Sequence, residues 1–360
     1  MNILFTTHQG DTAGATYSIA YLAKGLAAKG HRVYVAARAE SLLFSLLKDS
    51  GVHLRAMVFK SKKDVKAIRQ LRDLILSEKI ELVNAQDSRD RYLTIFAKWW
   101  YQLNVKIVHT RRQRPKSVGG WLHNMFYVRG TDRIIVISDE LKNIFVDRGF
   151  PESHLYVIYN GTPREQYANI QSERVEELRK KYGLQPNDTV IGCVARMKEQ
   201  PQLIESLQYI DDDIKVVFAG IPAGSLDKYV AQFNIKNPII YTGTLDRKDT
   251  LHLYKLLNVN VLPSTMDGFG LVLVEAMALE VPVVATNFGG IKNVISHGVD
   301  GLLFEDNNIE ELAEQIRKAL FNTSVREKLI KNGQITALEK FSVEKTVQNH
   351  EAFFQSLIDA

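Results

Sequence analysis

Two carboxylates, Asp267 and Glu275, flank a pair of glycines in the segment 263–278, which reads PSTMDGFGLVLVEAMA. The apolar run before it predicts a buried strand, and the run after the glycines is rich in helix-forming residues. A strand, a glycine turn and a helix N-terminus form an anion site, because unpaired N–H groups and the helix dipole favour negative charge. Acids beside a phosphate would repel it, so we expect these two to accept hydrogen bonds from hydroxyls. Phosphates together with hydroxyls indicate a nucleotide sugar.

The same segment resembles the acid-x7-acid motif of the retaining glycosyltransferases of the GT-B fold, the "group 1" enzymes or glycosyltransferase family 4. Their usual pattern is PSxxEGFGxxxxEAM, and this chain has Asp267 where the first Glu usually stands. The resemblance implies that Asp267 holds hydroxyls of the sugar as a catalytic residue, and that Glu275 accepts from the ribose. It implies diphosphate contacts at Gly268, Phe269, Gly270 and Leu271. An ordinary sheet-to-helix turn with incidental acids is the alternative.

Further donor contacts are expected in the second half of the chain. Arg196 ends the apolar run 190–195, and its planar guanidinium suits the oxygens of a leaving diphosphate, which makes it a catalytic candidate. Relatives carry a lysine shortly after this arginine, but the loop here looks shortened, so either Lys198 or Gln200 takes its place. The resemblance also implies that Gly243 and Leu245 contact the base of the nucleotide.

In the first half, His109 ends a strand-like run. The resemblance implies that this imidazole faces the transferred sugar, where it could stabilise the leaving phosphate or orient a hydroxyl. A structural histidine is the alternative. Gly14 lies in the glycine-containing loop 8–16 before a predicted helix, and the resemblance implies a backbone contact to the donor diphosphate. A loop that merely turns the chain is the alternative there.

A cationic cluster stands between two aromatic-rich stretches, 92–103 and 119–127, and consists of Arg111, Arg112, Arg114 and Lys116. This composition is typical of a segment at the surface of an anionic membrane, although core packing would also explain the aromatics. It resembles bacterial enzymes that build the lipopolysaccharide core. We therefore expect an anionic glycan or glycolipid acceptor here, and peripheral contact with an anionic membrane.

Composition sets broad limits on the chain. The 360 residues, 45% hydrophobic and 24% charged, are typical of a soluble protein with two domains. The single cysteine, Cys193, excludes an internal disulfide and lies in a strand-like run. Residues 1–165 carry 26 Lys and Arg against 15 Asp and Glu, whereas residues 166–360 carry 20 against 26. The first half could therefore meet nucleic acid, anionic lipid or a phosphorylated glycan, or carry only solvated charge.

Apolar runs alternate with helical patterns along the chain, which predicts doubly wound parallel sheets of the α/β class. In the first half, strands are predicted at 3–6, 33–36, 53–58, 82–85, 106–109 and 133–137, and helices at 16–29, 41–49, 64–78, 90–103, 120–128 and 139–148. The resemblance implies a GT-B fold, in which two Rossmann-like domains face each other across a cleft. The expected parts are an acceptor-binding domain at 1–165, a nucleotide-sugar-binding domain at 166–340, and a helix at 341–360 that packs back on the first domain.

The resulting hypothesis is a retaining hexosyl- or heptosyltransferase that uses a nucleotide diphosphate sugar in envelope glycan (lipopolysaccharide core) biosynthesis. We expect no cofactor and no required metal, since no Asp-x-Asp motif lies at a strand end and cations can hold the diphosphate. The chain opens on a strand with no signal peptide and no apolar run of membrane length, which predicts a cytoplasmic enzyme, peripheral on the inner face of the plasma membrane. A nucleotide-sugar epimerase of the same fold and a basic nucleic-acid-binding protein are the alternatives, and we expect no nucleic acid partner.

Overall fold

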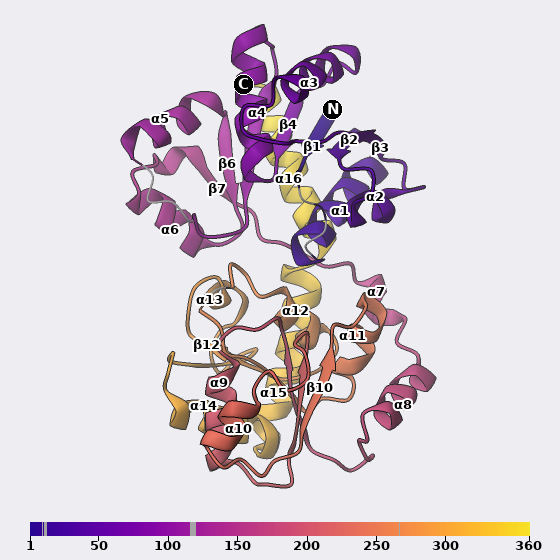
Figure 1. Cartoon of the computed structure of the whole chain (residues 1–360), viewed down its shortest axis with the longest axis vertical. Coiled ribbons are helices and arrows are strands. Elements are labelled where there is room, and N and C mark those ends of the chain that lie inside the picture. Colours follow the sequence, from indigo (N-terminus) through magenta and orange to yellow (C-terminus); the bar gives the residue numbers. More distant parts are fainter. Residues whose placement is uncertain (9, 11–12, 116–119, 266) are drawn as a thin grey trace. The chain divides into compact units, whose positions relative to one another are not determined.

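The chain folds into two compact units, each a parallel sheet with helices packed on it (Figure 1). The first contains Met1–Thr162 and Val343–Ala360, and the second contains Pro163–Ser342; the sequence-based expectation was 1–165 with 341–360, and 166–340. The computed structural model describes residues 1–8, 10, 13–115, 120–265 and 267–360. Lys116 lies outside these residues.

The N-terminal unit is built on a sheet whose described strands follow the order β3-β2-β1-β4-β5-β6-β7. Its strands are β1 (Asn2–Thr6), β2 (Arg32–Ala37), β3 (His53–Ala56), β4 (Leu82–Ala85), β5 (Lys106–Arg111), β6 (Arg133–Val136) and β7 (Leu155–Val157). Its helices are α1 (Ala13–Ala28), α2 (Leu42–Leu47), α3 (Val65–Ser77), α4 (Ser88–Tyr101), α5 (Trp121–Gly130), α6 (Asp139–Asp147), the 3₁₀ turn η1 (Glu152–His154) and α16 (Val343–Ile358). The strand order reverses between β1 and β4, where such sheets bind ligands.

Side-chain alternation along β1 explains why both faces of this sheet are covered. Ile3 and Phe5 pack in a core with residues of α1 and α16, whereas Leu4 packs on the opposite face with residues of α3 and α4. The last helix lies close against α1 because Gly25 has no side chain: a Cβ there would lie 2.3 Å from Cγ2 of Val347. The C-terminal helix therefore belongs to the N-terminal unit.

The C-terminal unit repeats the plan with the described strand order β10-β9-β8-β11-β12-β13. Its strands are β8 (Val190–Val194), β9 (Lys215–Ala219), β10 (Ile239–Gly243), β11 (Val259–Leu262), β12 (Val283–Thr286) and β13 (Leu302–Phe304). Its helices are α7 (Glu165–Ala168), α8 (Ser172–Lys181), α9 (Gln200–Ser206), η2 (Leu207–Tyr209), α10 (Asp227–Gln232), α11 (Arg247–Tyr254), α12 (Leu271–Ala278), α13 (Ile291–Val294), α14 (Ile309–Phe321), α15 (Thr323–Ile335) and the π-helical η3 (Thr336–Lys340). The order reverses between β8 and β11, so their carboxyl ends are the expected ligand edge.

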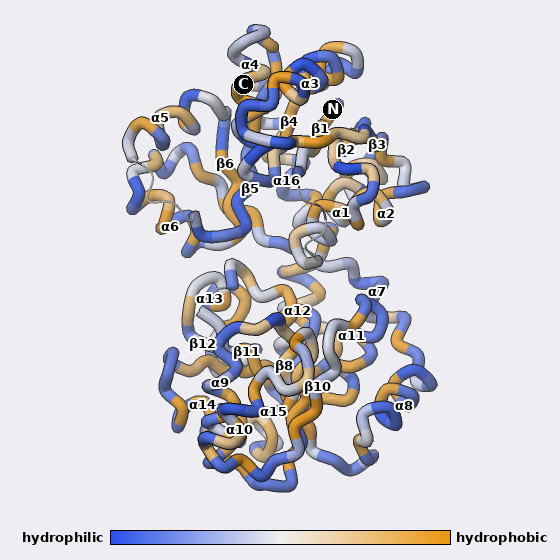
Figure 2. The backbone as a smooth tube through the Cα atoms, in the orientation of Figure 1, coloured by the Kyte–Doolittle hydropathy of each residue, from blue (hydrophilic) through white to orange (hydrophobic). Residues whose placement is uncertain are grey.

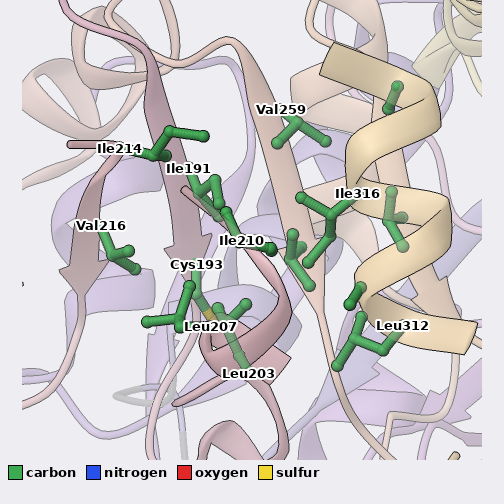
Figure 3. Packing of buried hydrophobic residues seen from close by; sticks show 14 of the residues in the cluster. Ile191, Cys193, Leu203, Leu207, Ile210, Ile214, Val216, Val259, Leu312 and Ile316 are labelled. Carbon is green, nitrogen blue, oxygen red and sulfur yellow. The ribbon is translucent and has the colours of Figure 1, made fainter. Parts of the chain in front are cut away.

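The core of this unit is formed by β-strand residues packed against α9 and α14 (Figure 3). Ile191 and Cys193 of β8 are fully buried there beside Ile316 of α14. Burial raises the pKa of the Cys193 thiol to about 12, so this cysteine is a small core residue. Figure 2 shows hydrophobic strands inside each unit and a largely hydrophilic α8 at the surface.

The predicted doubly wound α/β architecture is confirmed, and two local differences matter for function. β5 runs two residues beyond the prediction and includes Arg111. A further strand, β7, pairs with β6 in a stretch for which the sequence analysis predicts no strand. Strand pairing at a sheet edge is decided by tertiary contacts, which a run of three residues does not reveal.

Candidate functional site

The loop after β8 carries the predicted phosphate-binding cations. Arg196 is exposed and forms no ion pair with any described residue. Gln200 is buried, donates from Nε2 to the carbonyl of Arg196 at 2.8 Å and accepts from the amide of Lys198. Its side chain is therefore bonded to the backbone of the loop at both of its polar atoms.

Lys198 instead forms an ion pair with Asp267. A second contact between the same two loops runs from Oγ1 of Thr265 to Oε1 of Glu199 at 2.6 Å. Both side chains of the ion pair are largely buried, at 16% and 22% exposure. These contacts join the loop after β8 to the turn after β11, so the shorter Asp at position 267 is in contact with a cation of the neighbouring loop.

The glycine turn leads into α12, which begins at Leu271. Gly270 has φ 86°, a conformation that favours glycine, and α12 has no acidic residue in its first turn. Gly290 packs directly against the turn, since a Cβ there would lie 2.0 Å from the carbonyl oxygen of Gly268. Phe269 is buried with its ring edge-on to Phe341 at 5.3 Å, so only its backbone is available to a ligand. The amides at the start of α12 are thus held in place without a competing carboxylate.

Glu275 lies in the second turn of α12 with only 6% of its side chain exposed. Its Oε1 accepts from Nη1 of Arg247 at 2.6 Å, and its Oε2 accepts from the hydroxyl of Tyr254 at 3.4 Å. Burial and the nearby Glu275 charge raise the pKa of Tyr254 well above its usual value, which keeps this hydroxyl a donor. Nη2 of Arg247 also donates to Oε1 of Gln166 at 2.9 Å.

The β10–α11 connection brings the predicted base-contacting residues toward Arg247. Gly243 ends β10 with φ 65°, and its carbonyl accepts from the amide of Gly220 at 2.9 Å. Leu245 is half-buried, two residues before Arg247 begins α11. One short connection therefore carries Gly243, Leu245 and the partner of Glu275.

The N-terminal unit contains a cavity of about 420 Å³ at the carboxyl ends of β1, β4 and β5. It contains Arg111, Arg112 and Arg114 of the predicted cationic cluster. Its described lining is Thr7, Gly10, Ala15, Thr16, Ile19, Lys62, Gln86, Asp87, Ser88, Arg91, Tyr92, Arg111, Arg112, Gln113, Arg114, Pro115, His123 and Tyr127.

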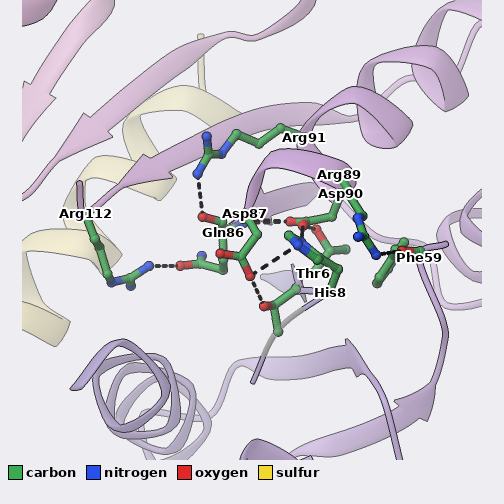
Figure 4. Close-up of polar contacts among 10 residues, drawn as sticks. Thr6, His8, Phe59, Gln86, Asp87, Arg89, Asp90, Arg91 and Arg112 are labelled. Atoms are coloured by element: carbon green, nitrogen blue, oxygen red, sulfur yellow. Dashed lines mark hydrogen bonds and ion pairs between the residues drawn. The ribbon is translucent and has the colours of Figure 1, made fainter. Parts of the chain in front are cut away.

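Gln86 connects two of the arginines in this cavity (Figure 4). Nη1 of Arg112 donates to the side-chain oxygen of Gln86, and Nη2 of Arg91 donates to the Gln86 carbonyl at 2.8 Å. Burial, together with the positive charge of Arg91 and against the attraction of Asp87, lowers the pKa of Arg112 to about 10. Arg111 lies with its guanidinium 4.9 Å from the ring centre of Phe145, and Arg114 forms an ion pair with Glu140.

Three potential metal ligands lie beside this cavity: His8, Asp87 and Asp90 have ligand atoms within 4.8 Å of one another. The fully buried carboxylate of Asp90 already accepts from the amides of Gln86 and Asp87, at 2.9 and 3.0 Å. His8 contacts the same carboxylate at 3.3 Å (Figure 4). Burial raises the pKa of Asp90, and these contacts fix the β4–α4 loop.

His109 and Gly14 are not in the cavity lining. His109 is fully buried, neither ring nitrogen has a hydrogen-bond partner among the described residues, and Tyr127 lies edge-on at 5.4 Å. Burial and the Arg91 charge lower the pKa of His109 well below its usual value. Gly14 is exposed in the first turn of α1, next to Ala15, which does line the cavity.

The aromatic stretches form a cluster on α4 and α5. Tyr92 stacks on Phe126 at 5.2 Å, which supports core packing for these rings. A second group of apolar side chains is exposed on the same helices: Trp99, Trp100, Trp121 and Leu122. No helix in the described part of the chain has the length and hydropathy to cross a membrane.

Sequence reasoning missed Arg247 and Tyr254 in the C-terminal unit, and Gln86, Asp87 and Arg91 in the N-terminal unit. The second group had a usable signal, because these residues follow β4 directly and the carboxyl ends of central parallel strands are where ligands bind. Arg247 and Tyr254 had no such signal. They lie on another helix, more than 20 residues before Glu275, and no sequence motif links them to it.

Two family models match the chain. The model described as Glycosyltransferase Family 4 matches residues 12–166, and the model described as Glycosyl transferases group 1 matches residues 174–336. An uncharacterized glycosyltransferase of Methanocaldococcus jannaschii is 31% identical over 246 residues, which span 68% of this chain and 65% of that relative. A capsular polysaccharide biosynthesis glycosyltransferase of Staphylococcus aureus is 27% identical over 82% of each chain.

Solved structures share the fold. The crystal structure of the Anabaena protein HepE in complex with UDP superposes with a TM-score of 0.84 and 22% identity, over 99% of this chain and 100% of that one. At this identity the likeness concerns the arrangement of helices and strands.

Proposed function

Because the chain belongs to the group 1 glycosyltransferases of family 4 and has the GT-B fold, we propose that it transfers a sugar from a nucleotide diphosphate donor to a hydroxyl. We further propose that the anomeric configuration is retained, which is the chemistry of the family its motif resembles. The observation that carries the donor assignment is the edge of the second sheet, where the Lys198–Asp267 pair joins a cationic loop to the glycine turn of α12.

The diphosphate would bind to Arg196 and to the amides at Gly268, Phe269, Gly270 and Leu271. As the bond between sugar and diphosphate breaks, negative charge grows on the diphosphate, and a guanidinium and fixed N–H dipoles stabilise it. No carboxylate occupies the first turn of α12, which supports this role. Lys198 is paired with Asp267. Its ammonium group would therefore contact both the Asp267 carboxylate and the diphosphate.

Glu275 would accept from the ribose hydroxyls. Arg247 and Tyr254 each use one of its two oxygens, and a carboxylate has about four acceptor positions, so capacity remains. The base would lie against Gly243 and Leu245 on the same connection as Arg247. Asp267 would hold hydroxyls of the transferred sugar, with the ion pair to Lys198 orienting its carboxylate.

For the acceptor we propose an anionic glycan or glycolipid at the N-terminal unit, bound by Arg111, Arg112, Arg114 and Lys116. A capsular polysaccharide enzyme among the relatives supports a role in envelope glycans such as the lipopolysaccharide core. We place the protein in the cytoplasm, peripheral on the inner membrane face through the exposed Trp and Leu side chains of α4 and α5. His109 would act through Tyr127, the cavity-lining residue that its ring contacts edge-on. Gly14 would act through its backbone at the start of α1.

Binding and product analysis test the proposed function. The transition temperature of the protein should rise with one of UDP, GDP or ADP, since a ligand that binds only the folded state stabilises it. The donor selected in this way should give a product whose anomeric configuration, read by NMR, equals that of the donor. Transfer should persist in a chelator, because cations of the protein are proposed to hold the diphosphate. No shift with any nucleotide diphosphate, or an inverted product, would contradict the proposal.

A further inference from the structure

The cavity of the N-terminal unit holds an excess of positive charge. Its described lining contains five cationic side chains and one acidic side chain, that of Asp87. The five are Lys62, Arg91, Arg111, Arg112 and Arg114. Two helices also begin at the cavity, with Ala15 of α1 and Ser88 of α4 in its wall. Helix N-termini add partial positive charge, so the backbone strengthens the same field.

Three of the arginines have no counter-ion among the residues that the structure describes. Arg91, Arg111 and Arg112 have no carboxylate within 4.0 Å among the described residues, whereas Arg114 is paired with Glu140. The Nε atom of each of the three is buried without a hydrogen-bond partner, and Arg91 is only 8% exposed. Burying a cation without an anion is unfavourable, because the protein then supplies no charge in place of the lost hydration. A site of this kind is complete when a ligand brings the negative charge.

Gln86 holds two of these arginines in fixed positions. Its backbone carbonyl accepts from Arg91 and its side-chain oxygen accepts from Arg112 (Figure 4). Both guanidinium groups are therefore hydrogen-bonded to one residue just after β4. Gln86 itself is 3% exposed, and its backbone N–H donates to the buried Asp90 carboxylate at 2.9 Å. The guanidinium groups of Arg91 and Arg112 are therefore held in position before a ligand binds, which lowers the entropic cost of binding.

We propose that this cavity binds a phosphate or diphosphate group of the acceptor, an inference that rests on the proposed transfer function. A phosphate monoester carries about −1.5 to −2 charges at neutral pH, which matches several guanidinium groups better than a single carboxylate does. The planar fork of arginine also pairs with phosphate oxygens through two parallel hydrogen bonds. Asp87 repels the anion, so the phosphate lies against Arg91 and Arg112. The Asp87 carboxylate already accepts from the Thr7 hydroxyl and keeps acceptor positions for a hydroxyl of the acceptor.

Calorimetric titration of the full chain with inorganic pyrophosphate tests the site. The titration is done in saturating nucleoside diphosphate, so that the donor site is already filled. We expect the Arg112→Gln variant to bind pyrophosphate at least about tenfold more weakly, the loss of one charge-assisted hydrogen bond. The matched control is Arg129→Gln, an exposed arginine of α5 outside the cavity, which should bind like the parent. Acetate should not compete.

The outcomes separate this inference from the proposed function. If the nucleotide binds but pyrophosphate does not, or if Arg112→Gln binds pyrophosphate as the parent does, the inference is wrong and the donor proposal stands. If no nucleotide diphosphate binds while the Arg112-dependent pyrophosphate site is present, the transfer function fails instead. Competition by glucose 6-phosphate would support a soluble acceptor, and competition only by vesicles containing a polyprenyl phosphate would support a lipid-linked one. Acetate competing as well as pyrophosphate would overturn the phosphate assignment.

Discussion

The carboxyl edges of the two sheets differ in whether their charged side chains are paired within the protein. In the C-terminal unit both predicted acids are already paired, Asp267 with Lys198 and Glu275 with Arg247. In the N-terminal unit Arg91 and Arg112 share one uncharged partner, Gln86, and form no ion pair with any residue in the described part of the chain. The first arrangement presets carboxylates and amides for a ligand with hydroxyls and a diphosphate. The second leaves positive charge for a ligand to neutralise.

Replacing Glu275 by Gln breaks the paired side of this comparison and should have the largest effect. The amide keeps the size of the side chain but loses the charge that Arg247 and the proposed ribose hydroxyls use. Two hydrogen bonds to a charged group, about 1.5–3 kcal/mol each, predict a loss in donor turnover of at least about 10²-fold. Release of nucleotide from the donor measures it.

Glu280→Gln is the matched control, since Glu280 follows the same helix, is exposed and pairs with Lys255. It should turn over the donor like the parent. Near-parental turnover by Glu275→Gln would show that the Glu275–Arg247 pair serves structure alone.

Acidification should destabilise the N-terminal unit through its buried histidines. Burial lowers the pKa of His350 to about 4 from the usual 6.5, and that of His154 to about 4 as well. Between these values the unfolded chain binds protons that the folded unit does not, so stability falls as the pH drops from 6.5 toward 4 and then levels off. For His350 the loss amounts to about 3 kcal/mol.

Urea unfolding followed by tryptophan fluorescence measures this effect, because all three tryptophans of the chain, at positions 99, 100 and 121, belong to the N-terminal unit. The free energy of unfolding should be lower at pH 4.5 than at pH 7, and the difference should shrink in His350→Gln. An equal pH dependence in variant and parent would rule out His350 as the source.

Arg196 sharpens the comparison, because it is an exposed cation of the C-terminal edge that forms no ion pair with a described residue. Arg196→Gln should weaken binding of the nucleoside diphosphate about 10- to 100-fold, as expected for the loss of one or two charge-assisted bonds. Binding of the nucleoside without phosphates should not change, and calorimetry of both ligands checks this. Equal weakening of both ligands would indicate a general disturbance of the loop.

Gly290→Ala tests the backbone of the glycine turn. Its Cβ would meet the carbonyl of Gly268, and overpacking of this kind costs about 1–3 kcal/mol of stability. Thermal unfolding measures the loss. Gly120→Ala is the control, since a Cβ at Gly120 meets no atom within 4 Å. Equal stability of both variants would show that the turn can move aside.

Much of the fold was predictable because hydrophobic runs and glycines act locally. The strand before Asp267, the glycine turn and α12 follow from one stretch of sequence. The partners of its acids did not, because Lys198 and Arg247 reach them only through the pairing of strands distant in sequence. The same reason hides the link from Arg112 to Gln86, which depends on β4 and β5 lying side by side. The bonds of Gln200 to the loop backbone likewise leave no mark in the sequence.

A crystal structure of the protein with its selected nucleotide diphosphate sugar tests the central claim most directly. The account predicts a pyrophosphate within hydrogen-bond distance of the amides at Gly270 and Leu271 and of the Arg196 guanidinium, with Glu275 bonded to the ribose. A donor whose pyrophosphate lay instead against Arg91 and Arg112 would contradict the assignment of the two edges.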